Sequence, residues 1–305
     1  MNIKKIISVI LLIIIISGCL YFTLMTKEVT IYNEKDKLDV VVTTFSAYDF
    51  TKHIAGDNIN LMFLLGPGVD SHGYEPSAAD IVKIQNADVF IYVGGTLEPW
   101  SKKIISNLPE SVKTLRLIDS IDLKEEINER EYDEHIWTST ENAAKMIKYI
   151  ETSLSDLDSN NSKLYKENSK KYIEEINNVK QEIKEIVTTA KRKKLVFGDK
   201  MPMQYFIEEF GFDVVAAFNG CAEETVPTSK TIAYLVDLIK NEKIPVILYI
   251  ELSEGRVAKT LAKETGAKTM QIQTLHNISK EDFENGETYT SLMKRNIEVL
   301  KEALN

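Results

Sequence analysis

The 305-residue sequence is poor in cysteine and histidine, with two cysteines and four histidines. The cysteines, Cys19 and Cys221, lie far apart, and the first belongs to the N-terminal segment. This excludes the disulfide framework that stabilises many small secreted domains. Cys221 follows Asn219 and Gly220 in a predicted tight turn, and we expect it to be a small buried thiol that contributes to packing.

Two catalytic motifs are also missing. The sequence contains neither the His-Glu-x-x-His motif of zinc hydrolases nor the Gly-x-Ser-x-Gly motif of serine hydrolases. There is no excess of positive charge either, because the net charge is −9. An acidic chain has no general attraction for nucleic acid or for an anionic membrane surface. We therefore expect no nucleic-acid partner.

The N-terminal apolar run, Ile6–Ile16, is too short for a transmembrane helix, which needs roughly 20 residues. It follows Lys4 and Lys5, an order typical of an export signal. The Ile-Ser-Gly-Cys sequence that ends at Cys19 resembles the lipobox of bacterial lipoproteins, which implies that Cys19 carries a lipid. We expect a signal peptide over 1–18 and a lipidated tether over 19–37, the alternative being a retained signal anchor. A lipoprotein of this kind is held at the extracytoplasmic face of the cell membrane.

After residue 37, short apolar runs alternate with amphipathic stretches. Such alternation is typical of α/β proteins with mostly parallel sheets covered by helices. The predicted strands are 38–44, 59–65, 88–94, 112–118, 194–198, 212–218, 244–252 and 267–275. The intervening helices include 46–56, 77–87 with Ser77 as N-cap, a helix capped by Thr138 and Glu141, 203–211, 228–243, 255–266 and 287–304.

The segment from Ser162 to Lys194 differs from the rest, because it lacks Gly and Pro and is rich in Lys and Glu. Its sparse apolar stripe predicts one long helix with a wide polar face, whereas a disordered charged linker would show no stripe. We therefore expect an N-terminal lobe over 38–158, a connecting helix over 159–193 and a C-terminal lobe over 194–305.

Three of the four histidines follow predicted strands. His72 follows 59–65, His135 lies in the acidic loop after 112–118, and His276 follows 267–275. Asp199 follows 194–198, whereas His53 lies within a helix and is expected to be an ordinary histidine. In open α/β sheets, ligands bind beyond the carboxyl ends of the strands. Imidazole and carboxylate groups converging there predict a transition-metal site between the lobes.

Three sequence blocks carry a resemblance to a known family. GPGVDSHGYEPSAADIVKIQNADVFIYVGGTLEPW contains Pro-Gly-x-x-x-His and Gly-x-x-Leu-Glu-x-Trp. DEHIW is an Asp-x-His-x-Trp block, and the C-terminal region ends in Gly-x-x-Tyr-x-x-x-Met-x-x-Asn. In this order, over 38–305, they resemble the metal-binding lipoproteins of zinc and manganese ABC importers. The resemblance implies a monomeric receptor that captures a divalent metal ion between two lobes and delivers it to an ABC permease.

The resemblance also implies the ligands. His72 and His135 match the family's N-terminal ligands. The third ligand stands five residues before a Tyr-aromatic pair, but Asp199 stands six before Tyr205, so Glu251 is kept as the alternative carboxylate. His276 stands at the fourth position, where the family has Asp.

Three imidazoles and one carboxylate favour zinc, because manganese prefers more oxygen ligands. The His-rich loop of many zinc receptors is replaced here by a short acidic stretch, so manganese stays open. The alternatives to a receptor are an exported metal-dependent hydrolase and a surface adhesin with the same fold. Because no hydrolase motif is present, we expect a binding protein rather than an enzyme.

Overall fold

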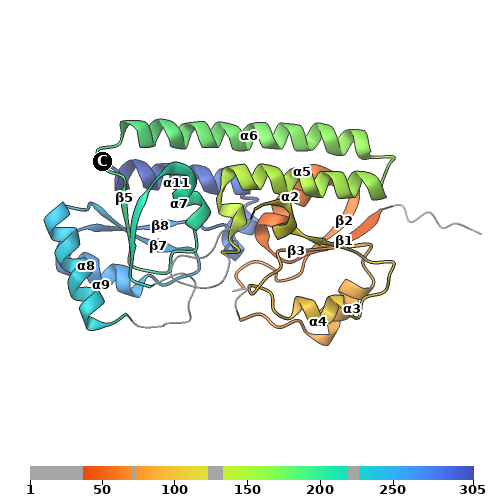
Figure 1. The fold of residues 1–305 in the computed structure, drawn as a ribbon, viewed down its shortest axis with the longest axis horizontal. Coiled ribbons are helices and arrows are strands. Elements are labelled where there is room, and N and C mark those ends of the chain that lie inside the picture. The colour runs from red at the N-terminus through yellow and green to blue at the C-terminus, as the bar shows by residue number, and fades with distance from the viewer. Residues whose placement is uncertain (1–36, 70–72, 123–132, 219–226) are drawn as a thin grey trace, which may run out of the picture. The chain divides into compact units, whose positions relative to one another are not determined.

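The described part of the protein is built on two parallel sheets, one in each lobe (Figure 1). The computed structural model describes residues 37–69, 73–122, 133–218 and 227–305. Within these ranges the strands form two four-stranded sheets with the orders β2-β1-β3-β4 and β6-β5-β7-β8, and every pairing is parallel. The N-terminal lobe holds β1 (Leu38–Val42), β2 (Ile59–Phe63), β3 (Val89–Tyr92) and β4 (Lys113–Arg116). The C-terminal lobe holds β5 (Lys194–Phe197), β6 (Asp213–Ala216), β7 (Val246–Ile250) and β8 (Lys268–Ile272). The predicted α/β class with two lobes is confirmed.

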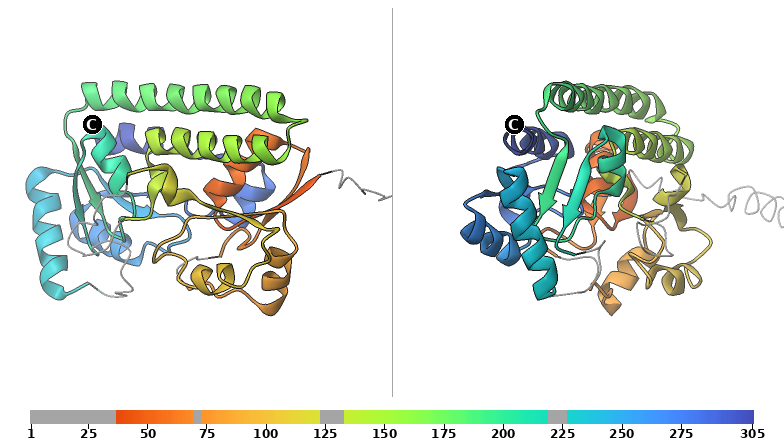
Figure 2. Two further views of the ribbon diagram at one scale, coloured as in Figure 1. Left: turned by 45° about the vertical axis from the view of Figure 1, so that its right-hand side comes forward. Right: turned by 60° about the vertical axis from the view of Figure 1, so that its left-hand side comes forward.

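Helices cover both faces of each sheet, as the views in Figure 2 show. The helices are α2 (Phe45–Ala55), α3 (Ala78–Gln85), α4 (Ser101–Ile105), α5 (Thr140–Leu157), α6 (Ser162–Thr189), α7 (Gln204–Phe210), α8 (Ser229–Glu242), α9 (Arg256–Thr265), α10 (Lys280–Glu284) and α11 (Tyr289–Ala303). Two 3₁₀ turns, η1 (Leu117–Ser120) and η2 (Ile136–Thr138), complete the described elements.

The alternation of side chains along each strand explains the double covering. In β1, Val40 and Val42 face the core beneath α2 and α5, while Val41 faces the core beneath α3 and α4. In β5, Val196 packs towards α8 and α9, and its neighbours point to the opposite face. Both faces of these strands are therefore apolar, as expected for a buried parallel sheet.

Helix α6 connects the lobes and packs on α5, α2 and α11 along its length (Figure 1). It spans 28 residues, Ser162–Thr189, and contributes Tyr172, Ile176 and Ile183 to a core cluster that extends through both lobes. The prediction of a connecting helix is confirmed. None of the helices within the described part of the chain is both long and apolar enough to cross a membrane.

The start of α5 differs from the prediction. Its N-cap is Ser139, whose hydroxyl accepts a hydrogen bond from the Asn142 N–H, rather than Thr138. The Thr138 hydroxyl instead donates to the His135 carbonyl at 2.7 Å, because η2 turns the chain immediately after the histidine. The predicted capping box was therefore wrong by one residue, and the 3₁₀ turn explains why.

Candidate metal centre

His135 is held by a carboxylate two residues before it. The Asp133 Oδ1 accepts the backbone N–H of His135 at 2.9 Å and lies 2.8 Å from its Nδ1. Because a carboxylate oxygen accepts, Nδ1 carries the proton and Nε2 is the nitrogen suited to coordinate a metal ion. A carboxylate behind a ligating imidazole also raises the basicity of the ring. Both residues are buried, so this orientation is fixed by the fold.

His276 follows β8 after three residues, Gln273, Thr274 and Leu275, that are all buried. The side-chain amide of Asn296 in α11 makes two hydrogen bonds to the backbone of Gln273. It accepts the Gln273 N–H and donates to the Gln273 carbonyl, each at 2.7 Å. Leu275 has φ of 63°, a left-handed conformation that a bulky side chain rarely adopts. The backbone turn that presents His276 is therefore imposed by its surroundings.

The rings of His135 and His276 meet edge to face, although they belong to different lobes. Their centroids are 5.3 Å apart with an interplanar angle of 84°. Trp137 contacts both, with its ring 5.4 Å from that of His135 and 5.1 Å from that of His276. The structure thus brings together one predicted ligand from each lobe.

Asp199 stands immediately after β5, beside Gly198. A Cβ added at Gly198 would overlap the backbone of Ala258 in α9, so only glycine allows this close approach. The Asp199 Oδ1 accepts the Lys200 N–H at 2.8 Å. Its Oδ2 is buried and has no hydrogen-bond partner among the described residues. A buried carboxylate oxygen without a partner is costly unless a ligand binds it.

Glu251, the alternative carboxylate, is engaged within the protein. Its Oε2 accepts the Thr274 N–H at 2.7 Å, and its Oε1 accepts the Thr274 hydroxyl at 2.5 Å. Burial raises the pKa of Glu251, and hydrogen bonds from Thr274 and from the His276 backbone oppose this shift. Both carboxylate oxygens are therefore bound to the segment that carries His276.

His72 lies outside the described residues, as do Cys19 and Cys221. The chain shortly before His72 is described, and it is attached to the C-terminal lobe. Asn277 donates from Nδ2 to the carbonyls of Gly66, at 3.0 Å, and Val69, and Gly68 donates its N–H to the Ile278 carbonyl at 2.7 Å. The segment leading to His72 is thus hydrogen-bonded to the residues that follow His276.

Two buried glutamates of the N-terminal lobe lie in the region of His135. Glu134 accepts the backbone N–H groups of Thr96 and Leu97, and Glu98 accepts that of Gly94 at 2.9 Å. Burial raises the pKa of Glu134 and raises that of Glu98 to about 7, the backbone hydrogen bonds opposing both shifts. The Glu134 carboxylate thus holds the 94–98 loop against the loop that presents His135, and the Glu98 carboxylate closes the 94–98 loop on itself.

The remaining features lie elsewhere. His53 stacks on Tyr172 of α6, with ring centroids 3.7 Å apart, and is no part of the His135–His276 pair.

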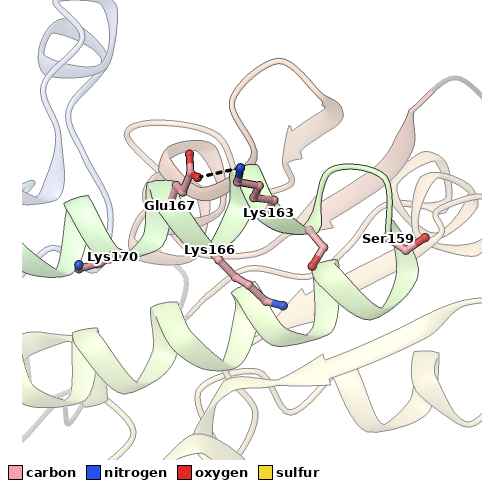
Figure 3. A pocket seen from close by; sticks show the side chains of 6 residues that line it. Ser159, Lys163, Lys166, Glu167 and Lys170 are labelled. Atoms are coloured by element: carbon pink, nitrogen blue, oxygen red, sulfur yellow. Dashed lines mark ion pairs between the residues drawn. The ribbon is translucent and has the colours of Figure 1, made fainter.

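The surface depression in Figure 3 lies at the start of α6. It is lined by Lys163, Lys166, Lys170 and their neighbours and offers no imidazole. Within the described ranges, no three His, Cys, Asp or Glu side chains form a metal-binding group. The structure therefore shows that His135 and His276 lie close together, and the ligand roles of His72, His135, Asp199 and His276 stay predictions.

Four residues around the pair received no role from the sequence: Asp133, Trp137, Thr274 and Asn277. The Asp-x-His-x-Trp block contains the first two, and the spacing of two between Asp133 and His135 could have indicated the hydrogen bond. Thr274 and Asn277 carry no such signal, because their partners are distant in sequence.

The chain is similar to known zinc-binding and zinc-uptake proteins. The chain is 31% identical over 280 residues to the zinc-binding lipoprotein AdcA of Streptococcus pneumoniae, a match that covers 87% of this chain and 56% of AdcA. The chain thus spans little more than half the length of that relative. It is 30% identical over 283 residues to the high-affinity zinc uptake system protein ZnuA of Bacillus subtilis, covering 88% of each.

A solved structure shows the same fold. The Zn(II)-bound ZnuA-like domain of S. pneumoniae AdcA superimposes with a TM-score of 0.77 at 33% identity, over 88% of this chain and 99% of that one. The model of the family described as zinc-uptake complex component A, periplasmic (ZnuA), matches residues 40–303. The resemblance expected from the three sequence blocks is confirmed: this chain belongs to the ZnuA family of periplasmic zinc-uptake components.

Proposed function

We propose that this protein captures a divalent metal ion, with zinc as the preferred cargo, and delivers it to an ABC permease. The observation that carries the proposal is the pair of neighbouring imidazoles, His135 and His276, one from each lobe of a ZnuA-family fold. Carriage needs a site enclosed by protein ligands, whereas hydrolysis needs an open water position and a general base. The absence of hydrolase motifs from the sequence supports carriage.

The proposed ligands are His72, His135, Asp199 and His276. Asp133 prepares His135 by fixing its tautomer, and the unpartnered Oδ2 of Asp199 is a buried acceptor that a cation would satisfy. Glu251 is less suited, because Thr274 occupies both of its oxygens. Three nitrogen donors and one oxygen favour tetrahedral zinc over manganese.

The proposed ligands divide equally between the lobes, with His72 and His135 in 38–158 and Asp199 and His276 in 194–305. Helix α6 (Ser162–Thr189), within the proposed connecting segment 159–193, packs on both lobes through a common core. Metal binding would therefore link two lobes whose relative position is already restrained. We propose that the receptor acts as a monomer, because all four proposed ligands belong to one chain.

Membrane attachment is proposed from the N-terminal sequence. Cys19 would carry the lipid after removal of 1–18, and the tether would hold the receptor near its permease. In membrane fractionation, Cys19→Ala should move the protein into the soluble fraction. If the variant remains with the washed membranes, Ile6–Ile16 acts as a retained anchor and the lipidation proposal is wrong.

A zinc titration tests the central proposal. The purified protein is titrated in competition with a chromophoric chelator, alongside His135→Ala, His276→Ala and the matched control His53→Ala. Loss of a ligand should cost more than the roughly 10–100-fold in affinity that loss of an outer-shell partner costs. His53→Ala should bind as the unmodified protein does. Equal zinc affinity of all four proteins would contradict the proposed site.

A further inference from the structure

Thr274, two residues before His276, has all three of its polar groups bound by buried residues from distant parts of the chain. Glu251 at the end of β7 accepts its N–H at 2.7 Å and its hydroxyl at 2.5 Å. The indole N–H of Trp137 donates to its carbonyl at 2.9 Å. Each group would be expensive to leave unpaired in the interior, so together these bonds fix the backbone of Thr274.

Trp137 is in turn fixed at its backbone and contacts both histidines. The Tyr289 hydroxyl donates to the Trp137 carbonyl at 2.8 Å, and the Trp137 side chain is fully buried. Trp137 stands two residues after His135, just as Thr274 stands two residues before His276. The Trp137–Thr274 hydrogen bond therefore joins the two ligand-bearing segments at equal sequence distances from their histidines.

Leu275 shows how strongly this segment is constrained. It is fully buried, and its φ of 63° costs conformational energy for a residue with a branched side chain. Because Thr274 on one side is fixed by Glu251 and Trp137, the turn at Leu275 directs His276 towards His135. The contacts at Thr274 and Leu275 thus orient His276, while Asp133 orients the ring of His135.

From this geometry we propose that Trp137 and Glu251 are positioning residues of the metal site. Trp137 sets the separation of His135 and His276 across the lobes, and Glu251 holds Thr274 so that the indole can bind it. The proposal rests on the proposed metal-binding function and deepens it. A preset pair avoids the cost of ordering side chains on binding, which increases affinity. Glu251 then acts through Thr274, without touching the metal ion.

Trp137→Phe tests the inter-lobe bond, because it keeps an aromatic ring and removes the indole N–H. Tyr172→Phe is the matched control: it removes a buried donor, the hydroxyl that bonds to Asp49, away from the site. Zinc affinity is measured by chelator competition, and the visible spectrum of the cobalt(II)-loaded protein reports ligand geometry. Trp137→Phe should lower zinc affinity about 10–100-fold and alter the cobalt spectrum. Tyr172→Phe should lower thermal stability and change neither readout.

Glu251→Gln and Glu251→Ala separate positioning from direct ligation. Glutamine retains an oxygen for the Thr274 N–H and offers its amide N–H to the Thr274 hydroxyl oxygen, so Glu251→Gln should keep zinc affinity within about threefold and an unchanged cobalt spectrum. Glu251→Ala should lose about as much affinity as Trp137→Phe. An equal loss in Glu251→Gln and Glu251→Ala would make Glu251 a ligand and overturn its positioning role.

Two further outcomes distinguish this proposal from the proposed function. If His276→Ala loses zinc while Trp137→Phe binds zinc with the affinity and cobalt spectrum of the unmodified protein, the metal site stands and the positioning proposal is wrong. If the unmodified protein fails to bind zinc, or His276→Ala binds it equally well, both proposals are wrong.

Discussion

The two lobes orient their histidines in different ways. In the N-terminal lobe, the orientation of His135 is local, because Asp133, two residues earlier, binds both its backbone N–H and its ring. In the C-terminal lobe, His276 follows Thr274, whose partners Glu251 and Trp137 are 23 and 137 residues away in sequence. A local arrangement can form with its loop, whereas a non-local one requires the assembled fold.

The buried glutamates show a second contrast between the lobes. Glu251 uses both carboxylate oxygens in hydrogen bonds to Thr274, whereas the Oε1 of Glu98 has no hydrogen-bond partner among the described residues. Both have a raised pKa, caused chiefly by burial. Each lobe therefore carries a buried glutamate whose neutral form is favoured, and hydrogen bonds oppose the shift, from Thr274 in Glu251 and from the Gly94 N–H in Glu98.

The largest expected effect tests whether the two lobes form a single site. A ligand that binds only the folded state stabilises it by about 4 kcal/mol at a thousandfold excess over Kd. Zinc should therefore raise the melting temperature by several degrees, and a chelator should reverse the rise. The gain should shrink as the pH falls, because protons compete with the metal ion for the imidazole nitrogens.

His135→Ala and His276→Ala should each remove most of the zinc-dependent rise, measured by differential scanning calorimetry. If only one of the two variants loses the zinc-dependent rise, the metal ion is bound by a single lobe. The proposal of one site shared by both lobes is then wrong. His53→Ala serves as the control and should keep the whole rise.

The next effect concerns Glu98, whose folded pKa of about 7 exceeds its ordinary value of 4.5. Between pH 4.5 and about 7 the Glu98 carboxyl keeps its proton in the folded protein and releases it in the unfolded chain. The free energy of unfolding therefore falls as the pH rises through this range. Relative to the unmodified protein, Glu98→Gln should gain about 3 kcal/mol between pH 4.5 and 7. Urea unfolding of both zinc-free proteins across this range measures the difference, and parallel pH profiles would contradict it.

A smaller loss of zinc affinity is expected when the hydrogen bond between Asp133 and His135 in the N-terminal lobe is removed. Asp133→Ala removes the carboxylate behind His135 and should reduce zinc affinity about 10–100-fold, as expected for the outer-shell partner of a ligating histidine. Asp133→Asn keeps an acceptor oxygen without the charge. Its zinc affinity should lie between those of the unmodified protein and Asp133→Ala. Chelator competition measures both, and unchanged affinity in Asp133→Ala would show that the fold orients His135 without its neighbour.

The smallest effect is expected on the outer face of α6. Lys163 and Glu167 form an exposed pair at 4.0 Å beside the depression in Figure 3, and exposed pairs of this kind contribute little. Lys163→Ala and Lys166→Ala should leave both the zinc affinity and the zinc-dependent melting shift unchanged. A loss of zinc affinity in either variant would place part of the metal site on this face.

Much of the fold could be predicted because its signals are local in sequence. The alternation that places Val40 and Val42 on one face of β1 and Val41 on the other follows from strand geometry alone. The Ser77 cap of α3 also needs only neighbouring residues, and it was predicted correctly. The α5 cap was misplaced because the 3₁₀ turn after His135 engages Thr138 in a different hydrogen bond.

The sequence by itself determined the α/β class, the connecting helix, the family and the positions of the histidines relative to the strands. These properties depend on periodicity, on composition and on motifs whose residues lie close together in the chain. The tertiary structure decided that the rings of His135 and His276 lie together, that Glu251 binds Thr274 and that Trp137 contacts both histidines. Such contacts join residues many positions apart, and their geometry depends on how the two sheets pack around a common core with α6, which no local pattern in the sequence specifies.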